Sequence, residues 1–300
     1  MAEWSQQQLK SPKSQALFNL ITEIQMGVPL DQLSLLYHLY SWRSINQRMI
    51  DDRRVKGGTQ QICQLLAQPL ANQIHLGAPV RTIEQNEQGV KVQSDAGCFA
   101  ARYLIITVPP KPALTIDYQP ALPVERTQLL ASSTLAQTMK CIIVYDKPFW
   151  VEAGLSGFMM SDEGPLKFTD DCSPIGSTHG ALVGFSSSTI HPWCQSSQQE
   201  RRADVLKQLS NNFGSQAAKP LEYVDQDWVA YPWAGGAYFV NMPPNVMTRY
   251  SSDLLRQPVG RIHWAGTETA TLWTGSMEGA ICSGERAATD VLQKLQTDPT

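Results

Sequence analysis

The segment at residues 261–280, RIHWAGTETATLWTGSMEGA, constrains the fold more than any other part of the chain. Residues 262–265 form a short apolar run that is typical of a buried strand. Gly266 supplies a turn after this strand, and Glu268 lies just beyond it. In open α/β sheets, ligands bind beyond the carboxyl ends of the strands. The segment therefore predicts a strand that ends at a ligand-binding crevice.

A long helix is predicted directly after this turn, over residues 276–295. We expect Thr274 to be its N-cap, because hydroxyl oxygens accept hydrogen bonds from first-turn amides. Gly275 and Gly279 would let a neighbouring group approach the backbone closely. The positive end of the helix dipole favours a ligand group that becomes negative. The same pattern also fits an ordinary strand–loop–helix in which the glycines serve packing alone.

Composition limits the class of protein. The 300 residues suggest one or two domains, and a hydrophobic fraction of 42% is enough for a sizeable core. A net charge of -3 gives no basic excess, so we expect no nucleic-acid partner. Low net charge with this hydrophobic content also argues against an intrinsically disordered chain.

The cysteines and the apolar runs are typical of an intracellular protein. Six cysteines are too few for a disulfide scaffold, and they form no CxxC pair, so we expect buried, reduced thiols and no metal site. The first residues lack the apolar stretch of a signal peptide. No run approaches the ~20 apolar residues that span a bilayer. We therefore expect a soluble, cytoplasmic protein without a membrane partner.

Hydrophobic periodicity predicts helices and strands that alternate along the chain. The helix at 60–68 should turn Ile62, Leu65 and Leu66 inward. The strand at 103–108 is continuous and β-branched, as in strands buried on both faces. The predicted helices cover residues 14–24, 33–42, 60–68, 200–212 and 276–295. The predicted strands cover residues 74–80, 89–93, 103–108, 138–145, 181–186, 221–228 and 262–265.

The segment 261–280 closely resembles the C-terminal flavin-binding motif of the flavin-dependent monoamine oxidase family, the FAD amine oxidases. The resemblance extends through most of the chain, because further family motifs follow in the family's order. These motifs are VKGGT at 55–59, PVRTI at 79–83, KCIIVYDKPFW at 140–150, Trp228 with GGAY at 235–238, and RQPV at 256–259.

The resemblance implies an α/β fold with two parts. One is a partial FAD-binding Rossmann-like domain, and the other is an α+β substrate domain with a mixed sheet and helices. The FAD-binding parts would be residues 51–110 and 231–300. The substrate domain would consist of residues 1–50 and 111–230.

The implied reaction is the oxidation of a primary or secondary amine at its C–N bond. A hydride equivalent would pass to FAD, and the resulting imine would hydrolyse to an aldehyde. Oxygen would then reoxidise the flavin and form hydrogen peroxide. The implied small-molecule partners are therefore an amine and O2.

The resemblance also assigns candidate catalytic and substrate-binding residues. Lys140 would hold a water against the flavin N5 atom, unless its side chain simply extends to the surface. Tyr238 would be one wall of an aromatic cage that guides the amine. The second wall corresponds to Ser276, which is not aromatic and weakens the case for ordinary monoamine substrates. Phe168 and Phe185 correspond to substrate-cavity positions, although plain core packing would also explain them.

Four residues are candidate FAD contacts by the same resemblance. They are Val80, Trp228, Glu268 and Met277. The Met277 amide would face the flavin pyrimidine. Glu268 would accept hydrogen bonds from ribitol or ribose hydroxyls, or it would order the turn. Ala237 stands where the animal enzymes have the cysteine that is joined to the flavin. FAD should therefore bind noncovalently.

One family feature is missing, since no GxGxxG motif occurs in the chain. Gly57 and Gly58 do not replace it, because they lack a preceding strand and a third glycine. Three explanations stay open: a truncated product, a split enzyme whose partner chain supplies the dinucleotide unit, or a non-catalytic remnant that does not bind FAD alone. An apolar patch at the missing interface could also favour a homo-oligomer.

An L-amino-acid oxidase-like enzyme is the main catalytic alternative. Such an enzyme needs a cation that binds the carboxylate of its substrate. Arg81 and Arg261 are not obviously placed for this role.

Overall fold

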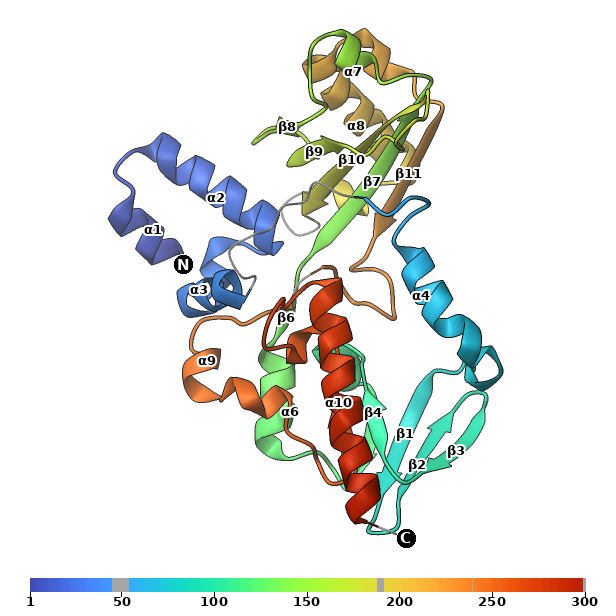
Figure 1. The fold of residues 1–300 in the computed structure, drawn as a ribbon. Helices are drawn as coiled ribbons and strands as arrows, with labels where there is room; N and C mark the ends of the chain where they lie inside the picture. Colours follow the sequence, from blue (N-terminus) through green and yellow to red (C-terminus); the bar gives the residue numbers. More distant parts are fainter. Residues whose placement is uncertain (45–53, 188–191, 239, 299–300) are drawn as a thin grey trace. The chain divides into compact units, whose positions relative to one another are not determined.

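The computed structural model describes residues 1–44, 54–187, 192–238 and 240–298. The chain forms two compact units, each built from two separate stretches of sequence (Figure 1). The first unit comprises Met1–Leu33 and Leu135–Asn241, and the second comprises Ser34–Thr134 and Met242–Thr300. The predicted domain boundary between residues 50 and 51 lies outside the described residues. The assignment of these units to substrate and FAD domains stays a prediction.

A sheet with the strand order β11-β7-β10-β9-β8 is the centre of the first unit. Every described pairing in it is antiparallel. The α/β fold class is confirmed. Parallel pairing needs crossover connections, whereas these neighbours run in alternating directions. The strands are β7 (Thr138–Tyr145), β8 (Met159–Met160), β9 (Phe168–Asp171), β10 (Gly180–Ser187) and β11 (Glu222–Asp227).

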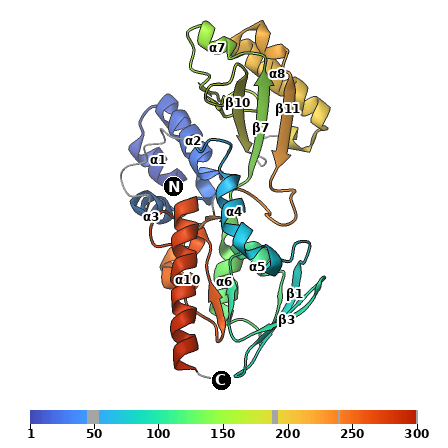
Figure 2. The same ribbon diagram turned by 45° about the vertical axis from the view of Figure 1, so that its right-hand side comes forward.

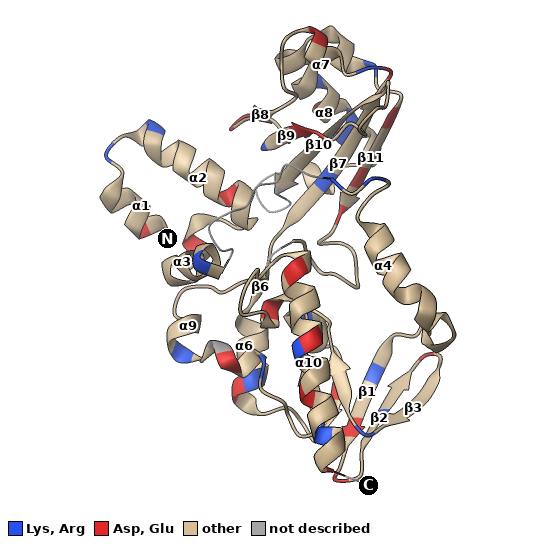
Figure 3. Ribbon diagram, viewed as in Figure 1, with Lys and Arg blue, Asp and Glu red and all other residues tan. Residues whose placement is uncertain are grey.

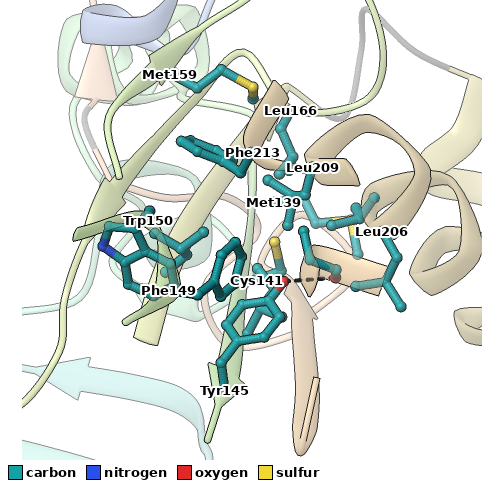
Figure 4. Close-up of a cluster of buried hydrophobic side chains, with 14 of the residues drawn as sticks. Met139, Cys141, Tyr145, Phe149, Trp150, Met159, Leu166, Leu206, Leu209 and Phe213 are labelled. Carbon is teal, nitrogen blue, oxygen red and sulfur yellow. Dashed lines mark hydrogen bonds between the residues drawn. The ribbon is translucent and has the colours of Figure 1, made fainter. Parts of the chain in front are cut away.

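One face of this sheet is covered by α8 (Gln198–Phe213), as Figures 1 and 2 show. The helix begins with a capping box in which Ser197 and Glu200 satisfy each other's backbone amides. Strand β7 alternates, so that Met139, Cys141, Ile143 and Tyr145 are buried toward the helix. In this core the Tyr145 hydroxyl donates a hydrogen bond of 3.0 Å to the carbonyl of Ala217 (Figure 4).

The N-terminal helices of the first unit lie before the sheet in sequence. They are α1 (Ala2–Gln8), α2 (Pro12–Met26) and the 3-10 turn η1 (Leu30–Gln32), and α2 packs against β10. Helix α2 ends at Gly27, whose φ of +64° is the left-handed cap conformation. The Gln137 amide donates to the Gly27 carbonyl at 2.8 Å. This bond fixes the end of α2 against the chain segment that enters β7.

The second unit contains a sheet with the order β3-β2-β1-β5, in which β1 and β5 are parallel and the other described pairings are antiparallel. Its strands are β1 (Val80–Gln85), β2 (Val90–Ser94), β3 (Gly97–Ala101) and β5 (Asp117–Gln119). The predicted strand at 74–80 is wrong, because β1 begins only at Val80. Gly77 adopts a turn with φ +63°, and Pro79 has no amide to donate.

A parallel pair of strands, β4 (Leu104–Ile106) and β13 (Ile262–Trp264), lies beside the long helix α10 (Met277–Thr297). The strand predicted at 103–108 is therefore shorter, and only its last residue, Ile106, is buried. The predicted helix at 276–295 is confirmed. Its N-cap is Ser276, whose side chain accepts from the Gly279 amide, so the prediction of Thr274 is wrong. The Thr274 hydroxyl instead donates to the carbonyl of Ala270.

Helix α4 (Gln60–Ala67) forms as predicted, but it has no buried residue in the described structure. Leu65 and Leu66, predicted to face inward, are 67% and 62% exposed. Leu65, Ile74 and Leu76 line an open groove of about 560 Å³. The helix is amphipathic as the sequence predicts, but no described element covers the apolar face of α4.

Shorter elements complete the described fold. They are α3 (Leu35–Ser44), η2 (Gln68–Gln73), α5 (Pro110–Ala113), α6 (Val124–Ser132), β6 (Thr134–Leu135), α7 (Phe149–Glu152), η3 (Pro192–Gln195), η4 (Ser215–Ala218), β12 (Val240–Asn241), α9 (Val246–Arg249), η5 (Ser252–Leu255) and η6 (Thr267–Thr269). Strand β12 pairs with β6.

Charges and thiols are distributed over both units. Acidic and basic residues are interspersed along the drawn ribbon (Figure 3). The expectation that the cysteines are buried is wrong for Cys63, Cys98 and Cys282, which are exposed. Cys141 and Cys194 are buried. Cys63 is exposed because it lies on α4, the helix without a buried face.

Substituting Gly27 with alanine should lower the free energy of unfolding by about 1–3 kcal/mol. The new Cβ would lie 2.5 Å from the Cβ of Ala136, in a backbone that alanine rarely adopts. Urea unfolding followed by tryptophan fluorescence measures this change.

Gly77→Ala is the matched control. Gly77 has nearly the same φ, +63°, and nothing lies within 4 Å of a Cβ there, so this variant carries the backbone strain alone. Equal losses of stability in the two variants would contradict the steric argument.

Candidate functional site

The register between β7 and β10 places Lys140 opposite Phe185. The Lys140 Nζ atom lies 5.4 Å from the centroid of the Phe185 ring, within cation–π range. Strand β9 pairs on the other side of β10 and sets Phe168 opposite Phe185. The two rings stack with centroids 4.7 Å apart and an interplanar angle of 2°. Three residues that are far apart in sequence thus meet on the sheet face opposite α8.

Tyr238 joins this cluster from a loop. Its ring meets Phe185 edge-on, with centroids 6.4 Å apart and an angle of 79°. Its hydroxyl donates a 2.7 Å hydrogen bond to the carbonyl of Ile24, in the last turn of α2. Desolvation by the surrounding protein raises the pKa of the Tyr238 phenol to about 12. The Tyr238 hydroxyl is therefore held by α2, and its ring contacts the sheet at Phe185.

A small cavity opens beside this cluster. Its enclosed volume is about 20 Å³, which is room for roughly one water molecule. The cavity is lined by Glu23, Ile24, Gly27, Thr138, Lys167, Phe185, Ser186 and Tyr238.

Sequence reasoning missed Glu23 and Lys167. Glu23 lies in the predicted helix at 14–24, and Lys167 directly precedes Phe168. Lys167 could have been found from the sequence, because it is a charged residue directly beside the predicted cavity position Phe168. Glu23 carries no such sequence signal, because it reaches the cavity only through the folded position of the last turn of α2.

The second unit builds its candidate site around the start of α10. The Thr267 hydroxyl donates to the Ser276 carbonyl at 3.0 Å and accepts from the Gly275 amide at 2.7 Å. The Ser276 hydroxyl donates to the Trp273 carbonyl and accepts from the Gly279 amide at 3.1 Å. These bonds tie the loop after β13 to the helix N-terminus, and they engage the Ser276 hydroxyl in capping.

Glu268 lies in η6, in the same loop. Burial raises the pKa of its carboxyl group above the ordinary value, and its own backbone amide lowers it in part. A partly desolvated carboxylate of this kind is stabilised by hydroxyl donors. The residue therefore suits a ligand that carries sugar or ribitol hydroxyls.

The N-terminus of α10 offers backbone amides to a ligand edge. Helix geometry leaves the first-turn amides without intrahelical acceptors, and the Ser276 cap satisfies that of Gly279. The amides of Met277 and Glu278 therefore remain to donate to a group that gains negative charge. The residues present fit the pyrimidine edge of a flavin ring.

The remaining predicted contacts lie elsewhere within their units. Val80 begins β1 and is half-buried in the second unit. Trp228 follows β11 in the first unit, and its ring meets that of Tyr231 with centroids 5.8 Å apart. The structure thus brings Lys140, Phe168, Phe185 and Tyr238 together in one unit. It brings Glu268, Ser276 and Met277 together in the other.

Comparison with known protein families matches residues 1–292 to the flavin-containing amine oxidoreductases. The chain belongs to this family. FAD is the cofactor that the family implies.

The relatives that the chain resembles carry the names of several different enzymes. The chain is 36% identical over 303 residues to AofH of Mycobacterium tuberculosis, covering 98% of this chain and 66% of AofH. It is 35% identical over 254 residues to flavin-containing amine oxidase B of the dog, covering 83% of this chain and 48% of that enzyme. An L-amino acid dehydrogenase of Synechocystis is 37% identical over 266 residues, covering 88% and 56%. The chain thus spans about half to two thirds of the relatives that it matches.

Solved structures show the same fold. Cyclohexylamine oxidase from Brevibacterium oxydans aligns with a TM-score of 0.90 at 31% identity, covering 98% of this chain and 67% of that one. Putrescine oxidase, solved with putrescine bound, aligns with a TM-score of 0.90 at 29% identity, covering 97% and 67%.

No group of three or more His, Cys, Asp and Glu side chains in the described ranges could hold a metal ion. Every described helix is too short or too polar to cross a lipid bilayer.

Replacing Glu268 with glutamine should change how stability depends on pH. Because the folded-state pKa of Glu268 is raised, its contribution is fully present below the unfolded pKa near 4.5 and is lost as pH rises through the folded pKa. As pH rises above about 4.5, the unfolding midpoint of Glu268→Gln should therefore increase relative to that of the wild type.

Thermal unfolding of both proteins over a pH series measures this difference. Glu222→Gln, at an exposed carboxylate of β11, is the control and should follow the wild type. A constant difference between Glu268→Gln and wild type at every pH would refute the raised pKa.

Proposed function

We propose that this chain forms the substrate-binding and flavin-facing part of an FAD-dependent amine oxidase. The cluster of Lys140, Phe185 and Tyr238 carries the proposal, because a chain of this family holds an ammonium group near one aromatic ring and a second aromatic ring against it. The proposed reaction is oxidative deamination of an amine to an imine and then an aldehyde, with O2 reduced to hydrogen peroxide. We place the protein in the cytoplasm.

The chain's own residues have separate proposed roles. Lys140 holds a water by donating hydrogen bonds from Nζ, while Tyr238 and Phe185 orient the amine through their ring faces and edges. Phe168 supports Phe185 by stacking. When bound, FAD supplies the acceptor for the two electrons that leave the amine carbon.

Flavin contacts would come from Glu268, Met277, Val80 and Trp228. Glu268 would accept from cofactor hydroxyls, and the Met277 amide would donate to the pyrimidine edge. Ala237 has no thiol, so a thioether to the flavin cannot form at this position and FAD would be held noncovalently. Ser276 would border the substrate space without supplying an aromatic wall, since its hydroxyl caps α10.

An enzyme that acts on amino acids is the second candidate function. The observation that favours it is Lys167, a cation at the same cavity as Tyr238. The two arginines considered from the sequence are already paired. Arg81 binds Asp95 at 2.6 Å, and Arg261 binds Asp298 at 2.9 Å.

The chain alone should bind FAD weakly, because its sequence offers no GxGxxG loop for the pyrophosphate. A partner chain that carries such a loop, or a second copy of this chain, would strengthen binding. The absorbance of the purified protein in the flavin band measures the occupancy. A fully yellow, stoichiometric preparation of this chain alone would overturn the prediction, and a chain that never takes up FAD would support the non-catalytic remnant.

Lys140→Met should slow flavin reoxidation in the FAD-loaded protein by about tenfold, the loss expected for one charge-assisted hydrogen bond. Stopped-flow absorbance after reduction by an amine and mixing with oxygen gives this rate. Lys147→Met is the control, because Lys147 forms an exposed ion pair with Glu152. Equal reoxidation rates in wild type and Lys140→Met would remove Lys140 from the mechanism.

A further inference from the structure

The loop that carries Glu268 is bound to α10 at both of its ends. This Glu268 loop, residues 265–268, lies between Trp264, the last residue of β13, and Thr269, the last residue of η6. The Nη2 atom of Arg286 donates to the Trp264 carbonyl at 2.8 Å and to the Thr269 hydroxyl at 3.0 Å. One side chain of α10 thus joins the two residues that flank the loop.

Two further hydrogen bonds fix the backbone of the loop at Gly266. Its amide donates to the hydroxyl of Ser283 at 3.0 Å, and Ser283 is a buried residue about one turn before Arg286 on α10. The Thr269 hydroxyl, which accepts from Arg286, itself donates to the Gly266 carbonyl at 2.9 Å. The guanidinium is therefore the first donor of a short chain of hydrogen bonds that ends at the turn.

The Glu268 carboxylate lies back against this turn. Gly266 has a φ of +101°, and a methyl group on its Cα atom would lie 3.2 Å from the Glu268 Oε2 atom. The conformation of the turn therefore decides where the carboxylate lies and how much water reaches it. Burial in this position raises the pKa of the Glu268 carboxyl group.

Tyr37 of α3 and Arg126 of α6 also lie near Glu268. Burial raises the pKa of the Tyr37 phenol, and the Glu268 charge raises it further. Arg126 lines the same small cavity as Glu268, and its guanidinium lies 4.5 Å from the centroid of the Trp264 ring. These contacts do not involve the guanidinium of Arg286, so a substitution at Arg286 leaves them in place.

We propose that Arg286 is a positioning residue, which directs the Glu268 carboxylate toward the hydroxyls of the cofactor by holding both ends of the Glu268 loop. Arg286 acts through the loop, since its other described ionic contact is with Asp290 at 3.4 Å on its own helix. This inference rests on the proposed role of Glu268 as an FAD contact, and it adds a residue to that site.

Replacing Arg286 has two opposite effects on the Glu268 carboxyl group. Loss of a positive charge by itself raises the pKa of a carboxyl group, because it disfavours the ionised form. Release of the loop lets water reach the carboxylate and lowers its pKa toward the ordinary value of 4.5. The direction of the change therefore separates a positioning role from a simple effect of charge.

Carbon-13 NMR of the glutamate carboxyl groups tests the proposal on the full chain without FAD, and Glu268→Gln identifies the resonance. Arg286→Met and Thr269→Val should each lower the titration midpoint of Glu268. Thr269→Ser keeps the hydroxyl and should titrate like the wild type. Arg202→Met, at an exposed position of α8, is the matched control and should do the same.

A raised or unchanged midpoint in Arg286→Met would overturn the proposal, even if the variant is less stable, because a merely structural arginine would change stability alone. If Arg286→Met does not fold, the two variants at Thr269 decide. Equal midpoints in Thr269→Val and Thr269→Ser would then overturn it.

An FAD titration followed by flavin fluorescence separates this inference from the proposed function. Arg286→Met should weaken FAD binding about tenfold, the loss expected for one misdirected charge-assisted hydrogen bond. If the wild type binds FAD and Arg286→Met changes neither affinity nor midpoint, the inference fails and the proposed function stands. If the midpoint falls but the wild type takes up no FAD, the hold on the loop stands and the proposed function fails. A lowered midpoint with unchanged FAD affinity would overturn the link to the cofactor.

Discussion

The backbone pairing of β7 with β10 is the interaction on which the first unit depends. It turns one face of β7 toward α8 to form the core, and that same alternation turns Lys140 toward the opposite face. A one-residue slip would exchange the two faces and bury the lysine in place of Met139 or Cys141. Stability and the candidate site therefore rest on one register. The stack of Phe168 on Phe185 extends that register to β9.

The second unit shows how a capping requirement can compete with a binding role. Ser276 corresponds to an aromatic wall in the resemblance, yet its hydroxyl caps α10 and its carbonyl accepts from Thr267. Serine at this position stabilises the N-terminus of α10. It also leaves the proposed cage without an aromatic side chain at its second wall. The apolar face of α4 is a different case, since no described element packs on it.

Much of the fold was predictable where a segment carries its own pattern. The strand at 138–145 and the helix at 276–295 alternate or repeat over many residues, and both form as predicted. Errors arose where a single residue overrides the pattern. Gly77 and Pro79 delay β1 to Val80. Leu65 is exposed for another reason, since no described element covers the apolar face of α4. The direction of strand pairing carries no local signal, because it depends on the connections between strands and not on composition.

The family and the candidate residues could be inferred from local motifs, because glycine turns, caps and periodic apolar positions act locally and recur along the sequence. The sequence also contains no glycine-rich pyrophosphate loop. The meeting of Glu23 and Lys167 at one cavity with Tyr238 became visible in the folded chain alone. These residues are far apart along the chain, and their meeting depends on where α2 ends and how β9 pairs. Such long-range juxtapositions leave no local pattern, because many registers would satisfy the same hydrophobic spacing.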